Sequence, residues 1–187
     1  NKHPTCVGFG KNISGKVVSA DFAEFPHLLV SGTTGSGKSI YVHSVIATLI
    51  MRMSPKDLKV VLVDPKRVEM TKYRDMPHLL CPIITDADKA TVMMNKLADE
   101  MNNRYSKFEE ANSCSDIKQY NKWAKENNRP TLPYILAVLD EYADLVDSNK
   151  EISKPVVSIA QKARAAGIHL LISTQRPSTN VITGTIK

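Results

Sequence analysis

The most informative stretch of the sequence is Gly32-Thr33-Thr34-Gly35-Ser36-Gly37-Lys38-Ser39. It fits the pattern Gly-x-x-x-x-Gly-Lys-Ser/Thr, in which glycines let successive backbone N–H groups turn toward phosphate oxygens. An apolar run, His27 to Ser31, precedes the loop, and an amphipathic stretch follows it from Lys38. This strand–loop–helix order is what phosphate binding at a helix N-terminus requires. The alternative is an ordinary glycine-rich turn at the start of a helix.

Each residue of this loop has an expected role in holding a nucleotide. The ammonium group of Lys38 is expected to reach the β- and γ-phosphates, and the hydroxyl of Ser39 to coordinate Mg²⁺. The dipole of the helix adds a favourable field for negative charge. Backbone N–H groups that surround the phosphates are expected from Thr33, Thr34, Gly35, Ser36 and Gly37.

An acidic pair, Asp140-Glu141, follows the apolar run that begins at Tyr134. In a parallel sheet this run delivers Asp140 to the edge that carries the phosphate loop, where it can hold Mg²⁺ through the water shell beside Ser39. Glu141 is expected to polarise the attacking water. Such a pair can also be no more than a solvated strand end. Because this glutamate favours ATP hydrolysis, and no Asn-Lys-x-Asp run is present to bind guanine, the predicted cofactors are ATP and Mg²⁺.

The whole chain alternates short apolar runs with longer amphipathic stretches, the pattern of an α/β sheet. Parallel strands are predicted at 27–31, 58–64, 134–140 and 169–174, because these runs are rich in Leu, Ile and Val without polar alternation. Helices are predicted at 38–53, 86–111, 116–127 and 151–166, with Gly167 closing the last one. We therefore expect a mostly parallel sheet with helices on both faces.

The N-terminal part of the chain has a different pattern. Glycines among alternating apolar residues at 7–21 predict an antiparallel hairpin. The expected organisation is an accessory β-hairpin segment in residues 1–25 and the ATPase core in residues 26–187.

Two further strand ends carry polar residues. The run that ends in Thr174 continues into Gln175, which at the same sheet edge is expected to sense the γ-phosphate and pass its state to the loop that follows. The alternative is a plain polar strand end. Asp64-Pro65-Lys66 ends the second predicted strand in the same way, and we expect a smaller direct role for it.

Composition limits the remaining possibilities. The three cysteines are widely spaced without Cys-x-x-Cys, which fits neither a disulfide framework nor a zinc site and predicts a reducing compartment. None of the five histidines falls in a metal-ligand spacing. No apolar run approaches the 18 or so residues of a membrane-spanning helix. The net charge of +6 is compatible with a polyanionic partner, but solubility alone explains it.

Taken together, these blocks resemble the FtsK/SpoIIIE DNA translocases, whose motors are hexameric RecA-like rings that pump double-stranded DNA. The similarity extends through nearly the whole chain, and its last three blocks are highly specific. The blocks that carry it are 26–30, the phosphate loop, 64–66, 76–80, Asp140-Glu141-Tyr142-Ala143-Asp144-Leu145, Gln161-Lys162-Ala163-Arg164-Ala165-Ala166-Gly167-Ile168-His169 and Thr174-Gln175-Arg176-Pro177-Ser178.

The resemblance implies further site residues by position. Arg164 looks like the family's arginine finger, offered across a subunit interface, although a solvated helix cation is the alternative. The stretch from Arg176 to Lys187 looks like the start of a DNA loop that faces the pore, with contacts expected from Arg176, Ser178, Thr179 and Asn180.

The function that the resemblance implies is ATP-dependent translocation of double-stranded DNA by a homohexameric ring, in chromosome or mobile-element segregation. It implies a cytoplasmic domain whose parent is anchored to the bacterial inner membrane through regions absent from this chain. Because the chain stops at Lys187, before the strands and second DNA loop that complete such a motor, we expect a C-terminally truncated RecA-like core, and ring assembly and translocation are expected of the parent protein.

Two alternatives remain at the level of sequence. The same family fold energises protein secretion or couples conjugative DNA transfer, and the blocks at 161–169 and 175–178 favour the segregation branch. The other alternative is a nucleotide-binding module without enzymatic activity, against which the intact Glu141 argues.

Overall fold

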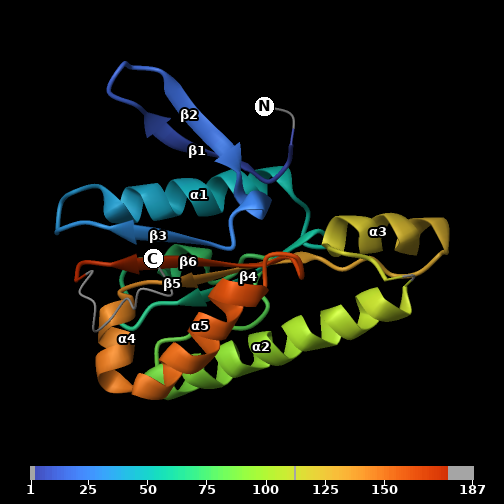
Figure 1. Ribbon diagram of the computed structural model, residues 1–187. Helices are drawn as coiled ribbons and strands as arrows, with labels where there is room; N and C mark the ends of the chain where they lie inside the picture. The colour runs from blue at the N-terminus through green and yellow to red at the C-terminus, as the bar shows by residue number, and fades with distance from the viewer. Residues whose placement is uncertain (1–2, 112, 177–187) are drawn as a thin grey trace.

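The centre of the molecule is a four-stranded parallel sheet in the order β3-β6-β5-β4 (Figure 1). The structure, a computed structural model, describes residues 3–111 and 113–176. The four predicted strands are confirmed to within one residue at each end. Their bounds are β3 His27–Ser31, β4 Leu58–Val63, β5 Tyr134–Leu139 and β6 Ile168–Thr174.

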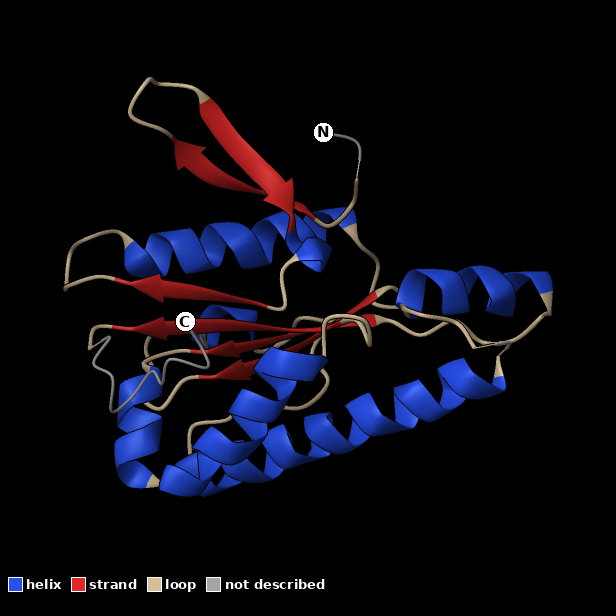
Figure 2. Ribbon diagram, viewed as in Figure 1, coloured by secondary structure: helices blue, strands red, loops and turns tan. Residues whose placement is uncertain are grey.

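Helices cover both faces of this sheet, as predicted (Figure 2). Helix α1, Lys38–Arg52, lies on one face, and α2 Ala87–Glu110, α4 Tyr142–Ser148 and α5 Ser153–Lys162 lie on the other. Alternate residues along the inner strands point into the two layers, so that Val60 packs toward α1 whereas Val61 packs toward α2 and α5. These strands lack polar alternation because both faces of the sheet pack against apolar layers.

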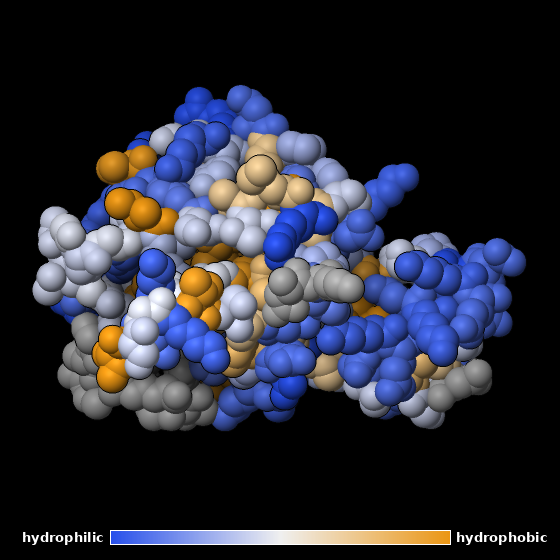
Figure 3. Space-filling view, turned by 90° about the horizontal axis from the view of Figure 1, so that it is seen from above, coloured by the Kyte–Doolittle hydropathy of each residue, from blue (hydrophilic) through white to orange (hydrophobic). Residues whose placement is uncertain are grey.

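The remaining elements lie at the periphery. Helix α3, Ile117–Glu126, packs its buried residues against the C-terminal end of α2. Short 3₁₀ helices connect larger elements at η1 Phe22–Glu24, η2 Thr71–Tyr73 and η3 Lys150–Ile152. Within the described residues, no helix has both the length and the apolarity needed to cross a membrane. Seen from the hairpin side, exposed hydrophobic side chains form small separate groups on a mostly hydrophilic surface (Figure 3).

The predicted hairpin is confirmed as an antiparallel pair, β1 Cys6–Lys11 with β2 Val17–Asp21. It lies on the outer side of α1, and Arg52 of that helix donates to the carbonyl oxygen of Cys6 at 2.8 Å. Val7 is buried in the same apolar layer as α1. The division into an accessory segment and an ATPase core stays a prediction.

One helix prediction was wrong at its ends, and one helix was missed. The helix expected at 151–166 ends at Lys162, because residues 163–167 form a turn in which Gly167 donates to the carbonyl of Arg164 and Ile168 to that of Ala163. Gly167 has a φ of +72°, and a Cβ there would lie 2.5 Å from Cδ1 of Ile117. Gly167 therefore serves the turn into β6 and does not cap α5. The other error is an omission, since α4 was not predicted.

A buried arginine stabilises the amino edge of the sheet, where the parallel strands begin. Arg104 of α2 is 1% exposed. Its guanidinium donates at 2.8 Å to Oε1 of Glu100 and to the carbonyl oxygens of Pro133 and Ala166. These bonds join α2 to the segments that lead into β5 and β6.

A buried histidine lies at the same edge. His169 of β6 is 1% exposed, and its Nδ1 donates to the carbonyl oxygen of Phe25 at 2.7 Å. Burial is the main cause that lowers the pKa of His169, to about 4, and the cations Arg164 and Arg104 lower it further. The imidazole is therefore neutral at physiological pH.

Candidate functional site

The phosphate loop joins β3 to α1 at the carboxyl edge of the sheet. Gly35 and Gly37 have φ angles of +80° and +88°, a left-handed conformation that glycine adopts without steric cost. Gly37 precedes α1 and supplies no side-chain cap to the first N–H groups of the helix. Uncapped N–H groups at the positive end of a helix suit a phosphate.

A cleft of about 290 Å³ opens beside this loop. Gln175, at the end of β6, reaches it, and its Oε1 accepts a hydrogen bond from Oγ1 of Thr34 at 3.3 Å. Because β6 lies next to β3 in the sheet, the strand order itself brings Gln175 to the loop. The residues that line the cleft are Thr33, Thr34, Gly35, Gly37, Lys38, Ser39, Ile40, Glu69 and Gln175.

Lys38 is surrounded by groups from the ends of β5 and β6. Its Nζ lies 3.5 Å from Oδ1 of Asp140 and 3.2 Å from Oγ of Ser173, and its side chain is only 8% exposed. Ser173 in turn donates to the same oxygen of Asp140 at 2.5 Å. The positive charge that the motif directs at phosphates is thus balanced here by a buried carboxylate. A bound phosphate would compete for it.

Glu141 is the most enclosed acid of the site. It is 3% exposed and has a φ of +44°, a left-handed conformation that is strained for a residue with a side chain. Its Oε1 accepts hydrogen bonds from Oγ1 of Thr174 at 3.1 Å and from the backbone N–H of Gln175 at 3.0 Å. Its Oε2 lies 3.4 Å from Nζ of Lys66 and 3.7 Å from Nζ of Lys38.

These donors keep Glu141 ionised. Burial alone would raise the pKa of Glu141, but the hydrogen bond from the Gln175 amide and the charges of Lys38 and Lys66 outweigh burial. The pKa therefore lies below its usual value. The result is a buried carboxylate beside the phosphate loop, able to accept a hydrogen bond from water whenever one of its cations moves away.

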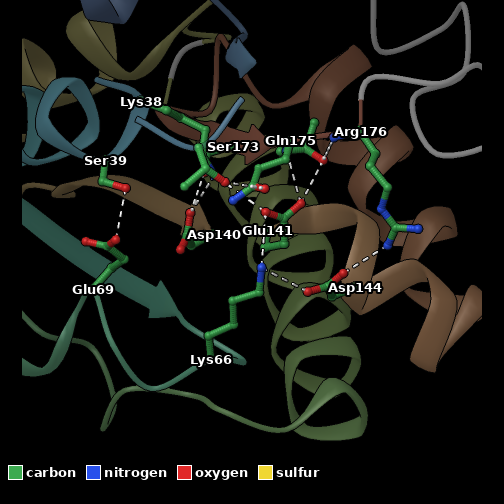
Figure 4. A network of polar contacts seen from close by, with 12 residues as sticks. Lys38, Ser39, Lys66, Glu69, Asp140, Glu141, Asp144, Ser173, Gln175 and Arg176 are labelled. Atoms are coloured by element: carbon green, nitrogen blue, oxygen red, sulfur yellow. Dashed lines mark hydrogen bonds and ion pairs between the residues drawn. The ribbon is translucent and has the colours of Figure 1, made fainter. Parts of the chain in front are cut away.

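A chain of charges extends outward from Glu141 (Figure 4). Lys66 lies 3.4 Å from Oδ2 of Asp144, whose Oδ1 is 2.9 Å from Nη2 of Arg176. Arg176 also pairs with Asp147 at 2.7 Å. Lys66 was expected to have only a smaller role from its place at a strand end, and nothing in the sequence pattern pointed to Asp144 as its partner.

Ser39 has a partner that sequence reasoning missed. Its hydroxyl donates to Oε1 of Glu69 at 3.0 Å, and the other oxygen of Glu69 lies 3.3 Å from Nε2 of His43. Burial would raise the pKa of Glu69, but the hydrogen bonds from Ser39 and His43 lower it on balance. Glu69 follows β4 by six residues in an irregular segment, where no motif or periodicity marks it.

The residues gathered here fit a magnesium nucleotide. Hydroxyl and carboxylate oxygens of Ser39, Asp140 and Glu69 are the hard oxygen donors that Mg²⁺ prefers, and it is bound through few protein ligands and several waters. The uncapped helix end and Lys38 offer the positive groups that phosphates require. Mg²⁺, when bound, would neutralise the charge that develops on the phosphates.

The other predicted residues lie apart from this cluster. Arg164 is exposed and precedes β6, so that it sits at the amino edge of the sheet, away from the phosphate loop of its own chain. Arg176 is described, whereas Ser178, Thr179 and Asn180 lie outside the described residues. The roles of all these side chains stay predictions.

Comparison with known proteins identifies the family. The model of the FtsK/SpoIIIE family matches residues 1–179. The chain belongs to the FtsK/SpoIIIE family. The resemblance inferred from the sequence blocks is thereby confirmed.

Relatives in the FtsK/SpoIIIE family are similar over the whole chain. It is 43% identical over 197 residues to the DNA translocase FtsK of Bacillus cereus, covering 100% of this chain and 25% of the relative. It is 44% identical over 188 residues to the DNA translocase SpoIIIE of Bacillus subtilis, covering 97% and 24%. The chain thus spans about a quarter of the length of these curated relatives.

Solved structures share the fold of this FtsK/SpoIIIE chain. The pCW3 conjugation coupling protein TcpA, solved as a monomer with ATPγS, is 29% identical with a TM-score of 0.84, covering 100% of this chain and 52% of that one. The cytoplasmic domain of the type VII secretion ATPase EccC of Thermomonospora curvata is 27% identical with a TM-score of 0.81, covering 97% and 22%. The predicted α/β P-loop ATPase fold is confirmed.

Proposed function

We propose that this chain is the nucleotide-hydrolysing core of a motor that moves double-stranded DNA, with Mg-ATP as its fuel. The observation that carries the proposal is the buried carboxylate of Glu141, which contacts Lys38 of the phosphate loop and the backbone of Gln175. A glutamate so placed can accept a hydrogen bond from the water that attacks the γ-phosphate. The ATPγS in the TcpA structure supports the nucleotide assignment.

The proposed roles follow the geometry. Lys38 leaves its carboxylate partners for the β- and γ-phosphates, and Gln175 senses the γ-phosphate through its contact with Thr34. Ser39 and Asp140 hold Mg²⁺, the latter through water. The backbone N–H groups of 33–37 surround the phosphates.

Relatives support DNA as the substrate that is moved. The relatives named DNA translocases are 43% and 44% identical, whereas the secretion ATPase EccC is 27% identical. Protein secretion or conjugative transfer is the second candidate, which the structural likeness to EccC and TcpA favours. Assembly into a homohexameric ring and location on the cytoplasmic side of a bacterial inner membrane complete the proposal, and both come from the family resemblance.

The test is Glu141→Gln in the assembled motor that contains this chain. The neutral amide oxygen accepts a hydrogen bond more weakly than a carboxylate and cannot act as a base toward the water, so turnover should fall by about a hundredfold to ten-thousandfold. Binding of Mg-ATP, measured by isothermal titration, should persist. Glu126→Gln makes the same chemical change on an exposed position of α3 and should leave turnover unaltered.

Asp140→Asn tests whether Asp140 and Glu141 have different roles. It should weaken nucleotide binding in the presence of Mg²⁺ more than in the presence of a chelator, because Asp140 acts through the metal. If Glu141→Gln and Asp140→Asn both hydrolyse ATP at near wild-type rates, the catalytic site lies elsewhere. If the wild-type motor hydrolyses ATP but duplex DNA does not stimulate it, polypeptide transport becomes the better assignment.

A further inference from the structure

We propose that Lys66 and Asp144 are positioning residues. When Arg176 binds duplex DNA, they change the surroundings of Glu141. We call the series of contacts Arg176–Asp144–Lys66–Glu141 the link. The inference rests on the proposed function, because it takes Glu141 as the residue that orients the attacking water and Arg176 as a DNA contact. The two added residues lie outside the phosphate loop and the acidic pair. The effect runs from the DNA contact at Arg176 to the catalytic carboxylate of Glu141.

Asp144 contacts both Arg176 and Lys66. Its Oδ1 is 2.9 Å from Nη2 of Arg176, and its Oδ2 is 3.4 Å from Nζ of Lys66 (Figure 4). Because one carboxylate serves both cations, removal of one changes the electrostatic attraction on the other.

Lys66 is shared between two acids. Its Nζ lies at the same distance, 3.4 Å, from Oδ2 of Asp144 and from Oε2 of Glu141. The side chain of Lys66 is 48% exposed and that of Asp144 36% exposed. Solvent can therefore reach the ammonium group of Lys66 as it changes partner. Glu141 is only 3% exposed, but its Oε1 keeps the hydrogen bonds from Thr174 and Gln175 when Lys66 moves away.

The two oxygens of Glu141 are held differently. Oε1 accepts from Thr174 and from the backbone of Gln175, and Thr174 itself accepts from the backbone N–H of Arg176 at 3.1 Å. The end of β6 therefore fixes this oxygen. Among the described residues, the partners of Oε2 are the cations Lys38 and Lys66. A nucleotide that attracts Lys38 therefore leaves Lys66 beside this oxygen.

DNA binding changes this balance. A phosphate of duplex DNA that pairs with Arg176 takes a cation from Asp144. The carboxylate of Asp144 then attracts Lys66 away from Oε2, and Glu141 becomes free to accept a hydrogen bond from the attacking water. Without DNA, Lys66 keeps this oxygen occupied and hydrolysis is slow.

The kinetic test measures ATP hydrolysis by the assembled motor without DNA. Arg176→Ala frees Asp144 as DNA does, and should raise the basal rate by about threefold or more, the size expected of coupling through a contact chain. Adding Asp144→Asn should cancel this rise, because no acid remains to attract Lys66. Lys66→Met should raise the basal rate and make it insensitive to DNA, whereas Lys66→Arg should restore stimulation.

Asp147→Asn is the matched control. Asp147 pairs with Arg176 as Asp144 does, but no ion pair joins it to Lys66 in the part of the chain that the structure describes. The control should therefore keep the ratio of DNA-stimulated to basal hydrolysis near the wild-type ratio. The link would be wrong if Arg176→Ala and the double variant Arg176→Ala with Asp144→Asn had equal basal rates. It would also be wrong if Lys66→Met lowered basal and DNA-stimulated hydrolysis equally.

A crystal structure of this chain with Arg176→Ala gives a readout that does not depend on activity. The link predicts that Lys66 stays paired with Asp144 and moves beyond hydrogen-bonding distance of Glu141. An unmoved Lys66 contradicts the link even in a motor that DNA stimulates. A wild-type motor that DNA does not stimulate contradicts the proposed function instead, so the two failures are told apart.

Discussion

Two charged side chains are buried at opposite edges of the same sheet, and their partners differ in kind. At the amino edge, Arg104 donates to two backbone carbonyl oxygens and to Glu100 of its own helix. At the carboxyl edge, Glu141 accepts from the end of β6 and faces Lys38 and Lys66. Both charges are compensated, as burial requires.

The difference lies in what can compete for the partners. Backbone carbonyls inside the fold meet no ligand, so the bonds of Arg104 hold α2, β5 and β6 together permanently. The ammonium group of Lys38 belongs to a loop shaped for phosphates, and a nucleotide would take it from Glu141. The buried charge at the amino edge thus stabilises the fold. At the carboxyl edge, a bound ligand would change the ion pairs of the buried charge.

Arg164 is the exception to this division of roles between the two edges. It lies at the amino edge, yet we propose that it acts on the nucleotide of a neighbouring subunit. Arg164→Ala should slow hydrolysis by the assembled ring about a thousandfold or more. Mixed with Lys38→Ala subunits it should regain part of the rate, at interfaces that combine an intact arginine with an intact phosphate loop.

No recovery in rings shown by mass spectrometry to contain both subunits would remove Arg164 from the site. The amino edge would then be structural throughout.

Arg104→Met tests the structural side of the comparison. It leaves the buried carbonyls of Pro133 and Ala166 without a donor, and should lower the free energy of unfolding by about 3 kcal/mol. Urea unfolding measures this. Glu100→Gln keeps both carbonyl bonds and should cost about 1 kcal/mol or less. Equal losses for the two variants would mean that the ion pair, and not the carbonyl bonds, stabilises this edge.

His169, at the amino edge, makes the stability of the fold depend on pH. Its folded pKa of about 4 is below the usual 6.5, so between these values the unfolded chain binds a proton that the folded chain does not. Its contribution is full above pH 6.5 and is lost as the pH falls toward 4. From pH 7 to 5 the free energy of unfolding should fall by about 2 kcal/mol through this group.

In His169→Gln that part of the pH dependence should disappear, while the other histidines remain as an internal control. Urea unfolding at both pH values measures it. An unchanged dependence would assign the acid lability to another group.

The sheet and the centre of the site were predictable from sequence because both follow from short-range patterns. Apolar runs without polar alternation marked the strands, and the parallel arrangement then required the phosphate loop and Asp140-Glu141 to meet at one edge. The family resemblance added Arg164 and Arg176, which no local pattern singles out.

The remainder depended on contacts between segments far apart in the chain. Glu69 meets Ser39 across 30 residues, and Lys66 meets Glu141 across 75, from a segment without regular periodicity. Helix α4 has only seven residues, too few to show a helical repeat. The early end of α5 reflects the turn into β6, whereas its alanines on their own favour continued helix.

We conclude that the buried charges at the carboxyl edge serve nucleotide binding and that the buried Arg104 at the amino edge serves the fold. Thermal unfolding of the wild type, Lys38→Ala and Arg104→Met, each with and without Mg-ATPγS, distinguishes these two roles. At a hundred times Kd the wild type should gain about 2.7 kcal/mol, and Arg104→Met should gain the same from a lower starting stability. Lys38→Ala should gain nothing, from a starting stability that is also lower because Asp140 and Glu141 lose a buried cation. A full gain in Lys38→Ala, or a lost gain in Arg104→Met, would contradict the account.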